Sequence, residues 1–523
     1  MSLPRTIGHR QQMPSQVEVR GLPSEEYTAK AMPHVLTSRD FLALFIVILL
    51  FLTNVPTAAA GGAAGLTFWI VGGLCFFIPC AVVTAQLATM FPSEGGIYVW
   101  THKAFGPYSS FFVGFCAWIP APLLILATSD LFVTYVQSLN AQWLVQPWQQ
   151  GIMLIALIAV TSIIALSHAR IVQNLVNAAA ALILCASFLI FLAGIVWLLK
   201  GQHSVVDFGQ GANWSITWGS GWNPFNGAGN FGIFGVITLG YLGVNIPLNM
   251  AAEMRSADGV GALKQRSTII RHLVWGTIIV LVGYLAVTFA VVVVQGSNAA
   301  VSLFSLVTTV DMAMGKFWGD VVAICIMGSL VVATILYNAA FSRWLLVAAL
   351  DSRIPRLFGK LNRVRVPGNA IIFQSCVAVF LALVFFFVVP LLGGANGATL
   401  ILQVYFVGVA AATLIWAFAT IFLFINFLKI FARHRANLHN LAILPVPLVV
   451  FCAVVGLITG AVAMVDTLFV SAVPTLVSNG QWFVLVGGTS GCLLILGVLA
   501  AMFGTSQAAW EGMENTGEQV PLS

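Results

Sequence analysis

Long apolar stretches alternate with short polar segments along almost the whole chain. A helix needs about 20 mostly apolar residues to cross the ~30 Å hydrocarbon core of a bilayer, and stretches of that length recur from residue 41 onward. The pattern predicts twelve membrane-spanning helices. These lie near residues 41–63, 66–90, 108–138, 151–168, 172–199, 229–252, 272–295, 319–349, 369–391, 399–428, 443–466 and 482–504.

The composition agrees with this pattern and excludes a soluble fold. Hydrophobic residues make up 60% of the 523 residues and charged residues only 7%, whereas soluble domains carry about 25% charged residues. We therefore expect an all-α polytopic membrane protein surrounded by the lipid bilayer.

The basic residues indicate an orientation. With the N-terminus inside, 20 of the 22 lysines and arginines fall on the cytoplasmic side, and only Lys200 and Lys316 fall outside. Positive charge resists translocation, so we expect both termini in the cytoplasm and the chain in the plasma (cell inner) membrane. The net charge of +6 then reflects topology, and no nucleic-acid partner is expected.

This orientation also gives the expected domain order. A cytoplasmic tail (1–40) leads to spans one to five (41–199), a long external loop (200–228) and spans six to ten (229–428). Spans eleven and twelve (443–504) and a short acidic cytoplasmic tail (505–523) follow. A second external segment, 297–318, is amphipathic enough to predict a short helix.

No sequence feature points to a cofactor, a metal site or an enzyme. All eight cysteines lie in apolar segments, which argues against a disulfide framework. The eight histidines are scattered, and no His/Cys pair has metal-ligand spacing. A membrane enzyme would need clustered His, Asp or Glu on facing helices, and the sequence shows no such cluster.

Two predicted spans carry a similar interruption. The first span contains Asn54 and Pro56, followed by alanines and glycines, and the sixth contains Asn245, Ile246 and Pro247. Proline frees backbone groups in a helix, and such groups must line a cavity or be buried in protein. Paired interruptions at corresponding positions are typical of the central site of an inverted-repeat transporter.

Backbone groups near each interruption are candidate substrate contacts. We expect a half-helix to begin near Thr57, so that N–H groups of Thr57 and Ala58 face a substrate carboxylate. Gly243 offers backbone groups in the sixth span. A simple proline kink is the alternative for either interruption alone.

Three further segments carry a family resemblance. They read FPSEGGIYVWTHKAFGP (91–107), YLGVNIPLNMAAEM (241–254) and SRWLLVAALDSRIPRLFGKLNRVRVPGNAI (342–371). Together they resemble the amino acid–polyamine–organocation (APC) superfamily over about residues 40 to 430. Asn54 with Pro56, and Trp118 with Pro120, are closest to its glutamate/GABA antiporter-like branch.

The resemblance implies a fold of leucine-transporter type. In that fold a 5+5 inverted repeat with broken helices 1 and 6 works by alternating access. It also implies that Tyr241, Tyr337, Asn338 and Tyr405 lie on spans that form site walls and gates. Packing within the membrane is the alternative for each of these side chains.

Charged residues within the spans are further candidates. Asp130 is the only acidic residue well inside a predicted span, and intramembrane carboxylates are functional hypotheses by default. It is expected to bind a substrate ammonium or a coupling proton, or else to lie near the outer water interface. Glu253, close to Arg255, is expected to belong to a cytoplasmic gate or a helix-end ion pair. Arg343 is expected to snorkel or to form part of a gate.

The expected function is secondary active transport of amino acids across the plasma membrane. A carrier of polyamines or other organic cations is the alternative, and a transporter-like ligand sensor without flux is another. H+ or Na+ is a possible coupling ion. The fifth span lacks the lysine that some proton-coupled members of the superfamily place at a sodium position, which favours exchange or another coupling group.

Overall fold

The computed structural model describes most of the chain. The described residues are 22–91, 95–140, 142–218, 229–254, 262–301, 304–393, 397–433, 442–474 and 476–517. Parts of five segments used above lie outside these ranges: the two tails (1–40 and 505–523), the motif at 91–107, the predicted external loop at 200–228 and the second external segment at 297–318.

The described residues form helices joined by short connections. In the first half they are α1 (Pro23–Ala31), α2 (Ser38–Leu49), η1 (Leu52–Asn54), α3 (Val55–Ala59), α4 (Ala63–Gly72), η2 (Gly73–Phe77), α5 (Ile78–Met90), α6 (Ile97–Phe105), α7 (Pro107–Trp118), α8 (Pro120–Leu139), α9 (Pro147–Ala165), α10 (Ala169–Leu199) and η3 (Gly211–Trp214).

The second half continues in the same way. Its helices are η4 (Asn230–Ile233), α11 (Phe234–Leu239), η5 (Ile246–Glu253), α12 (Ala262–Val294), η6 (Gly296–Val301), α13 (Ser305–Met314), α14 (Lys316–Leu350), η7 (Arg356–Gly359), α15 (Gly368–Leu383), η8 (Val384–Val388), α16 (Val389–Gly393), α17 (Gly397–Arg433), α19 (Val446–Phe469) and α20 (Asn479–Gly517).

Eleven helical segments of the described chain are long and apolar enough to cross a membrane. The expectation of an all-helical polytopic membrane protein is therefore confirmed. Each of the eleven overlaps one predicted span. The sixth predicted span, 229–252, instead consists of short pieces, η4, α11 and η5, separated by a turn.

Several helix ends differ from the prediction. The last helix, α20, continues to Gly517, whereas a tail was expected from residue 505. Part of the expected N-terminal tail forms α1, and a capping box starts α2 at Thr37. Within the third span, α7 ends at Trp118 and α8 begins at Pro120, where a proline in the first turn is well tolerated.

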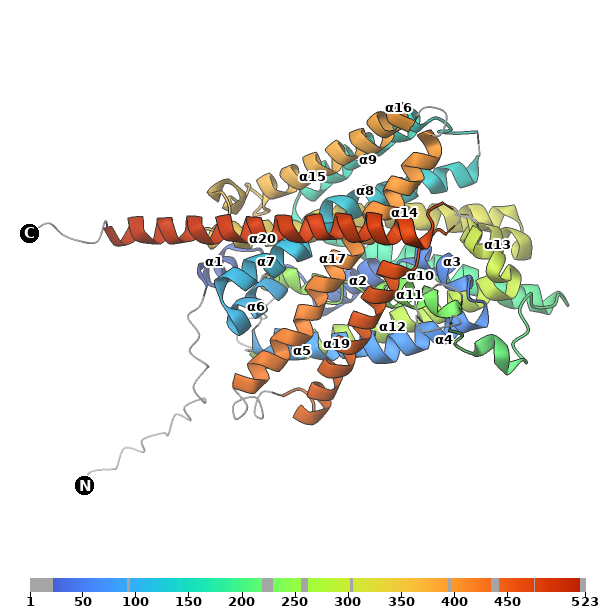
Figure 1. The fold of residues 1–523 in the computed structure, drawn as a ribbon, viewed down its shortest axis with the longest axis horizontal. Coiled ribbons are helices and arrows are strands. Elements are labelled where there is room, and N and C mark those ends of the chain that lie inside the picture. The colour runs from blue at the N-terminus through green and yellow to red at the C-terminus, as the bar shows by residue number, and fades with distance from the viewer. Residues whose placement is uncertain are drawn as a thin grey trace, which may run out of the picture.

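The helices pack as one bundle around α14 (Figure 1). The most extensive contacts of α14 are with α8 and α10, and α9 packs on α15 near one edge. Figure 1 shows α1 and α6 near one end of the bundle and α13 near the other. The broken segments lie within the bundle, since Val55, Val244 and Ile246 are all buried.

Candidate functional site

The first break lies upstream of the proline. Helix α2 ends at Leu49, and both Leu50 and Phe51 have non-helical backbone angles. Helix α3 then begins at Val55 with Pro56 in its first turn. A proline there costs no hydrogen bond, because the first N–H groups of a helix have no partner within it. Pro56 thus starts the second half-helix, and the expected start near Thr57 is two residues too late.

A tyrosine from a distant helix satisfies two of the backbone groups that the first break frees. The Tyr284 hydroxyl of α12 donates to the Leu49 carbonyl at 2.7 Å and accepts from the Phe51 N–H at 3.0 Å. An unpaired buried backbone group would cost about 1–3 kcal/mol. The tyrosine therefore stabilises the unwound geometry, and the sequence prediction did not include it.

The second break is a longer unwound turn. Helix α11 ends at Leu239, and the chain turns until η5 begins at Ile246 with Pro247 in its first turn. Gly243 has φ +109°, a region that L side chains rarely adopt. This glycine makes the turn possible.

The two breaks contact each other. A Cβ on Gly243 would lie 2.9 Å from Cγ2 of Ile48, at the end of α2. A Cβ on Gly240 would lie 3.1 Å from the side-chain nitrogen of Asn54. Two glycines of the second break therefore face Ile48 and Asn54 beside the first, and the segments that the sequence singled out lie together in space.

Asn245 is the best-placed polar side chain of the second break. It is buried, and its side-chain oxygen has no hydrogen-bond partner among the described residues. Leaving a buried polar oxygen unpaired is costly, so this atom has the character of a ligand contact. Trp416 of α17 lies nearby, 3.3 Å from the position of a Cβ on Gly243.

Aromatic rings form a wall beside the breaks. The ring of Trp69 stacks on Tyr284 with centroids 4.0 Å apart, and Tyr241 stacks on Phe77 at 4.4 Å. The Tyr241 hydroxyl donates to the Trp69 carbonyl at 3.0 Å, and the Trp69 indole donates to Thr288 at 2.9 Å. Tyr241 is thus tied into a packed cluster of α4, η2, α12 and the second break.

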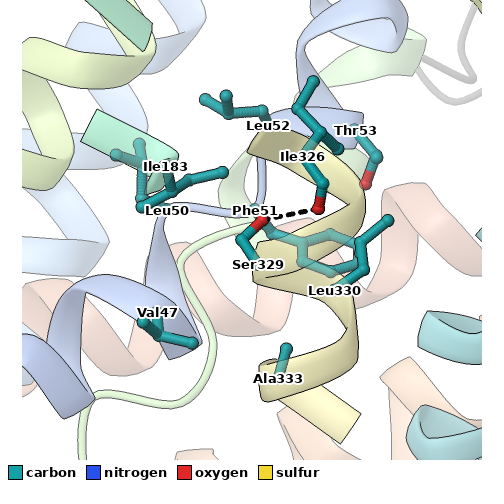
Figure 2. A pocket seen from close by; sticks show the side chains of 10 residues that line it. All are labelled: Val47, Leu50, Phe51, Leu52, Thr53, Ile183, Ile326, Ser329, Leu330 and Ala333. Atoms are coloured by element: carbon teal, nitrogen blue, oxygen red, sulfur yellow. Dashed lines mark hydrogen bonds between the residues drawn. The ribbon is translucent and has the colours of Figure 1, made fainter. Parts of the chain in front are cut away.

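A small cavity lies beside the first break (Figure 2). Its volume is about 20 Å³, room for one water-sized group. This is too small for an amino acid. Figure 2 shows its lining from the first break, α10 and α14: Val47, Leu50, Phe51, Leu52, Thr53, Ile183, Ile326, Ser329, Leu330 and Ala333.

Few polar groups border this cavity. Among its lining side chains only Thr53 and Ser329 are polar, and Ser329 donates to the Ile326 carbonyl at 2.8 Å. Leu52 and Thr53 are the first two residues of η1, so their backbone N–H groups have no partner within that helix. These two donors, rather than those expected at Thr57 and Ala58, lie next to the cavity.

The two remaining candidates of the first span, Thr57 and Ala58, form backbone contacts within the same segment of the chain. Ala58 is buried, and its carbonyl accepts from the Gly61 N–H at 3.1 Å. That carbonyl also lies so close to Gly65 that no side chain fits there. The Thr57 carbonyl accepts from the Ala60 N–H at 3.3 Å.

The two neighbouring candidates on α14 point to different places. The Tyr337 hydroxyl lies 3.4 Å from the Ile48 carbonyl, next to the first break. Asn338 instead donates to Ser162 at 3.1 Å and to Ser375 at 2.7 Å. It also accepts from Gln374. The structure therefore places Asn338 in a polar cluster that joins α9, α14 and α15, apart from the two breaks.

Asp130 and Tyr405 lie near each other on α8 and α17. The two side chains are close enough to interact electrostatically, and both are partly buried. The Asp130 carboxylate forms no hydrogen bond or ion pair with any described residue. It is therefore an unpaired acidic group in the outer part of the predicted third span.

A second intramembrane carboxylate was missed. Asp466, buried in α19, accepts a hydrogen bond of 2.7 Å from the N–H of Gly235 at the start of α11. A negative charge at a helix N-terminus is favourable, so Asp466 stabilises the short helix before the second break. The predicted eleventh span ended at residue 466, so the sequence placed Asp466 at the end of a span and not within it.

Glu253 and Arg343 form a fully buried ion pair. The shortest contact between the carboxylate and the guanidinium is 2.6 Å, and the two side chains are at most 2% exposed. The Glu253 carbonyl also accepts from the Leu36 N–H at 3.0 Å. The pair therefore joins η5, α14 and the segment that precedes α2.

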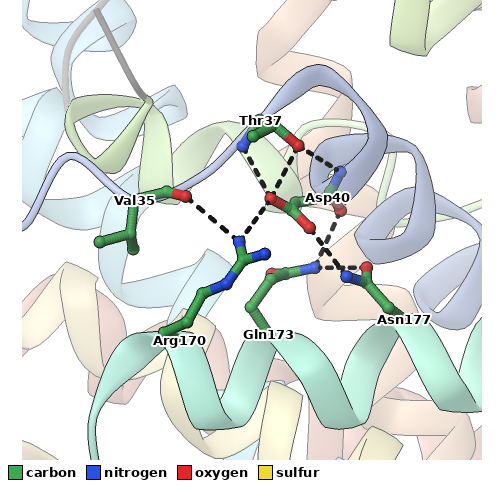
Figure 3. A network of polar contacts seen from close by, with 6 residues as sticks. All are labelled: Val35, Thr37, Asp40, Arg170, Gln173 and Asn177. Carbon is green, nitrogen blue, oxygen red and sulfur yellow. Dashed lines mark hydrogen bonds and ion pairs between the residues drawn. The ribbon is translucent and has the colours of Figure 1, made fainter.

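A second polar cluster holds the start of α2 against α10 (Figure 3). The Asp40 carboxylate accepts from the Thr37 N–H and from Asn177 at 2.8 Å each, and from Arg170 at 3.1 Å. Gln173 donates to the Asp40 carbonyl at 3.2 Å. Asp40 is thus saturated with donors although it is buried.

The N-terminal helix α1 closes over the same end of the bundle. The N–H and hydroxyl groups of Ser24 each donate to Asp351 at 3.0 Å, and Glu25 pairs with Lys103 at 3.1 Å. Burial raises the pKa of Asp351, and the two bonds from Ser24 oppose that rise. Together these contacts tie α1 to α6 and to the end of α14.

Comparisons with known proteins agree with this architecture. The family model described as amino acid permease matches residues 40–498. An uncharacterized transporter of Legionella pneumophila is 24% identical over 345 residues, 64% of this chain and 70% of that protein.

Two further relatives are named for amines. A probable agmatine/putrescine antiporter of Lactococcus lactis is 23% identical, over 66% of this chain and 70% of that protein. The polyamine transporter PUT1 of rice is 32% identical, but over only 23% of this chain and 24% of that protein.

Proposed function

Because the chain belongs to the amino acid permease family of the APC superfamily, and is therefore a secondary transporter rather than an enzyme, we propose that it carries amino acids by alternating access. The contact between the two breaks carries this proposal. It joins Ile48 and Asn54 of the first span to the turn that precedes Asn245, whose buried side-chain oxygen has no partner among the described residues. The substrate site would lie between these segments.

The groups at the breaks are complementary to an amino acid. The N–H groups of Leu52 and Thr53 suit a carboxylate, since backbone donors at a helix start favour anions. The side-chain oxygen of Asn245 suits an ammonium group. The rings of Tyr241 and Trp69 pack against each other beside the second break.

The proposed topology is the one that the basic residues indicate. Twelve spans with both termini in the cytoplasm require the broken segment at 229–253 to cross the membrane as the sixth span. A 5+5 inverted repeat of leucine-transporter type fits the family and the two breaks. In this orientation α1, the Asp40 cluster and the Glu253–Arg343 pair lie on the cytoplasmic side and close it.

A small organic cation is the second candidate substrate. The unpaired carboxylate of Asp130 favours it, because an acidic group in the outer pathway attracts amines, and two relatives are named for polyamines or agmatine. Glu253 and Arg343 are proposed as a gate and not as substrate contacts, because they already pair with each other. Exchange is the proposed mode, in line with the glutamate/GABA antiporter-like pattern around Asn54, and the coupling ion would be H+ or Na+.

Proteoliposomes test the site. The purified chain is first screened for thermal stabilisation by amino acids and by amines such as putrescine, since a bound ligand stabilises the folded state. Uptake of the best ligand is then measured for the wild type, for Asn245→Leu and for Asn140→Leu, a matched change at the exposed end of α8.

The two variants should behave differently. Asn245→Leu should abolish uptake and ligand stabilisation while the unliganded melting temperature stays near that of the wild type. Asn140→Leu should transport normally. Normal uptake by Asn245→Leu would refute the site, and tight ligand binding without flux in the wild type would indicate a sensor.

A further inference from the structure

His272 is a buried histidine with one unpartnered ring nitrogen. Its side chain is 1% exposed, in the first third of α12. The Nδ1 atom lies 3.1 Å from the Thr268 carbonyl, which can only accept, so Nδ1 carries the proton of the neutral ring. The Nε2 atom is buried and has no partner among the described residues. A proton on Nε2 would therefore be buried without any acceptor.

The imidazole packs directly on the first half of the broken first span. Its ring centroid lies 5.4 Å from that of Phe41 and 6.3 Å from that of Phe45, both in α2. One turn further along α12, Gly276 allows the Phe45 ring to approach the backbone closely. The tight packing of α2 on α12 thus depends on an uncharged residue at this position.

Among the described residues, no charged side chain pairs with this histidine. Its ring is buried, and the Thr268 carbonyl is its one hydrogen-bond partner in this part of the chain. Asp40, the nearest acidic residue in sequence to Phe41, is saturated by its own donors. The ionisable residues of α12 and of the helices packed on it are Arg39, Asp40, Cys80, Arg170, Cys185, Lys264, Arg266, Arg271, Tyr284 and Asp311.

We propose that His272 is a proton-binding site that links pH to the separation of α2 from α12. The neutral ring fits the closed packing, whereas a protonated ring requires water or an acceptor at Nε2. Movement of α2 away from α12 would supply that water. A proton that binds the open form better than the closed form shifts the equilibrium toward the open form.

This inference rests on the proposed function, because α2 is the half-helix that would move during alternating access. In the proposed orientation its release opens the cytoplasmic side. Binding of a proton by His272 would then favour the inward-open form and couple transport to the proton gradient, without the fifth-span lysine that this chain lacks.

Hydrogen–deuterium exchange of the full-length protein tests the linkage without requiring transport. Exchange of residues 38–49 is measured near pH 5.5 and near pH 7.5, on either side of the usual histidine pKa of about 6.5, and corrected for the intrinsic pH dependence of exchange. One linked proton permits a change of up to about tenfold per pH unit. We expect α2 of the wild type to open up to about 10-fold more at the lower pH, which is the limit for one group that titrates near 6.5 in the open form.

Two variants and one control separate titration from packing. His272→Phe keeps an aromatic ring and His272→Gln keeps a polar group, and in both the pH dependence of α2 exchange should disappear. His168→Phe, at an exposed histidine that precedes α10, should retain it. A wild type without pH dependence, or both His272 variants with the wild-type dependence, would overturn the inference. Absence of uptake together with intact linkage would instead refute only the proposed function.

Discussion

The two breaks differ in how their freed backbone is satisfied. At the first break, a hydroxyl from α12 binds both the Leu49 carbonyl and the Phe51 N–H, and helical structure resumes within a few residues. At the second, a glycine with positive φ makes the turn, and the buried oxygen of Asn245 has no partner among the described residues. The Tyr284 hydroxyl thus braces the first break and leaves the N–H groups of Leu52 and Thr53 for a ligand. At the second break a side-chain oxygen is left without a partner among the described residues.

This difference assigns separate tasks to the two segments. A braced break keeps its shape whether or not a substrate is bound, and it can present the N–H groups of Leu52 and Thr53 in a fixed geometry. An incompletely satisfied break gains more from a ligand, because binding removes the cost of the unpaired oxygen. We expect substitutions at the second break to affect binding and substitutions of the brace to affect stability.

The largest loss of stability is expected from a substitution at the point where the two breaks contact each other. Gly243→Val adds a branched side chain at φ +109° and directly against Ile48. Backbone strain of about 1–3 kcal/mol adds to the steric conflict between the breaks. Both the yield of folded protein and its melting temperature should fall sharply.

Gly106 provides the matched control for Gly243. It also has positive φ, but a Cβ there would meet nothing within 4 Å. Gly106→Val therefore carries the backbone strain without the contact. If the two variants lose equal stability in thermal unfolding, the contact between the breaks contributes nothing beyond the strain.

Removal of the Tyr284 hydroxyl, which braces the first break, should cause the next largest loss of stability. Tyr284→Phe keeps the ring that stacks on Trp69 but leaves the Leu49 carbonyl and the Phe51 N–H unpaired. The expected loss is about 1–3 kcal/mol, visible as a lower melting temperature. Ligand affinity of the remaining folded protein should change less than in Asn245→Leu.

Tyr108→Phe is a suitable comparison, since Tyr108 is exposed at the start of α7. It should unfold like the wild type. A Tyr284→Phe protein with unchanged stability but lost affinity would reverse the assignment, because the hydroxyl would then serve the substrate and not the backbone.

A smaller loss of stability is expected from substitution of Asp466. Asp466→Asn keeps an acceptor for the Gly235 N–H but removes the negative charge from the start of α11. Charges at helix ends are worth about 0.3–1 kcal/mol, and up to about 2 kcal/mol when partly buried. A modest decrease in melting temperature should follow. A gain in stability would show that the cost of burying the charge exceeds its benefit to α11.

The sequence predicted the breaks better than it predicted their supports. Asn54, Pro56, Gly243 and Asn245 lie in local patterns whose chemistry can be read from neighbouring residues. Tyr284 acts on a segment 233 positions away, and a tyrosine in an apolar span carries no local sign of its partner. Asp466 was missed because the predicted eleventh span ended at that residue. Asn338 was assigned to the site because a polar residue in an apolar run does not show which helix it faces.

The smallest loss of stability is expected from substitution of Pro56, the residue from which the sequence predicted the first break. Pro56 lies in the first turn of α3, while the unwound residues are Leu50 and Phe51. Pro56→Ala therefore restores an N–H where a helix has no internal acceptor, and it does not mend the helix. We expect a change in the free energy of unfolding within about 0.5 kcal/mol, near-normal uptake and unchanged exchange of residues 50–54. Stronger protection of those residues in Pro56→Ala would mean that the proline causes the unwinding, and the brace from Tyr284 would then follow the break and not define it.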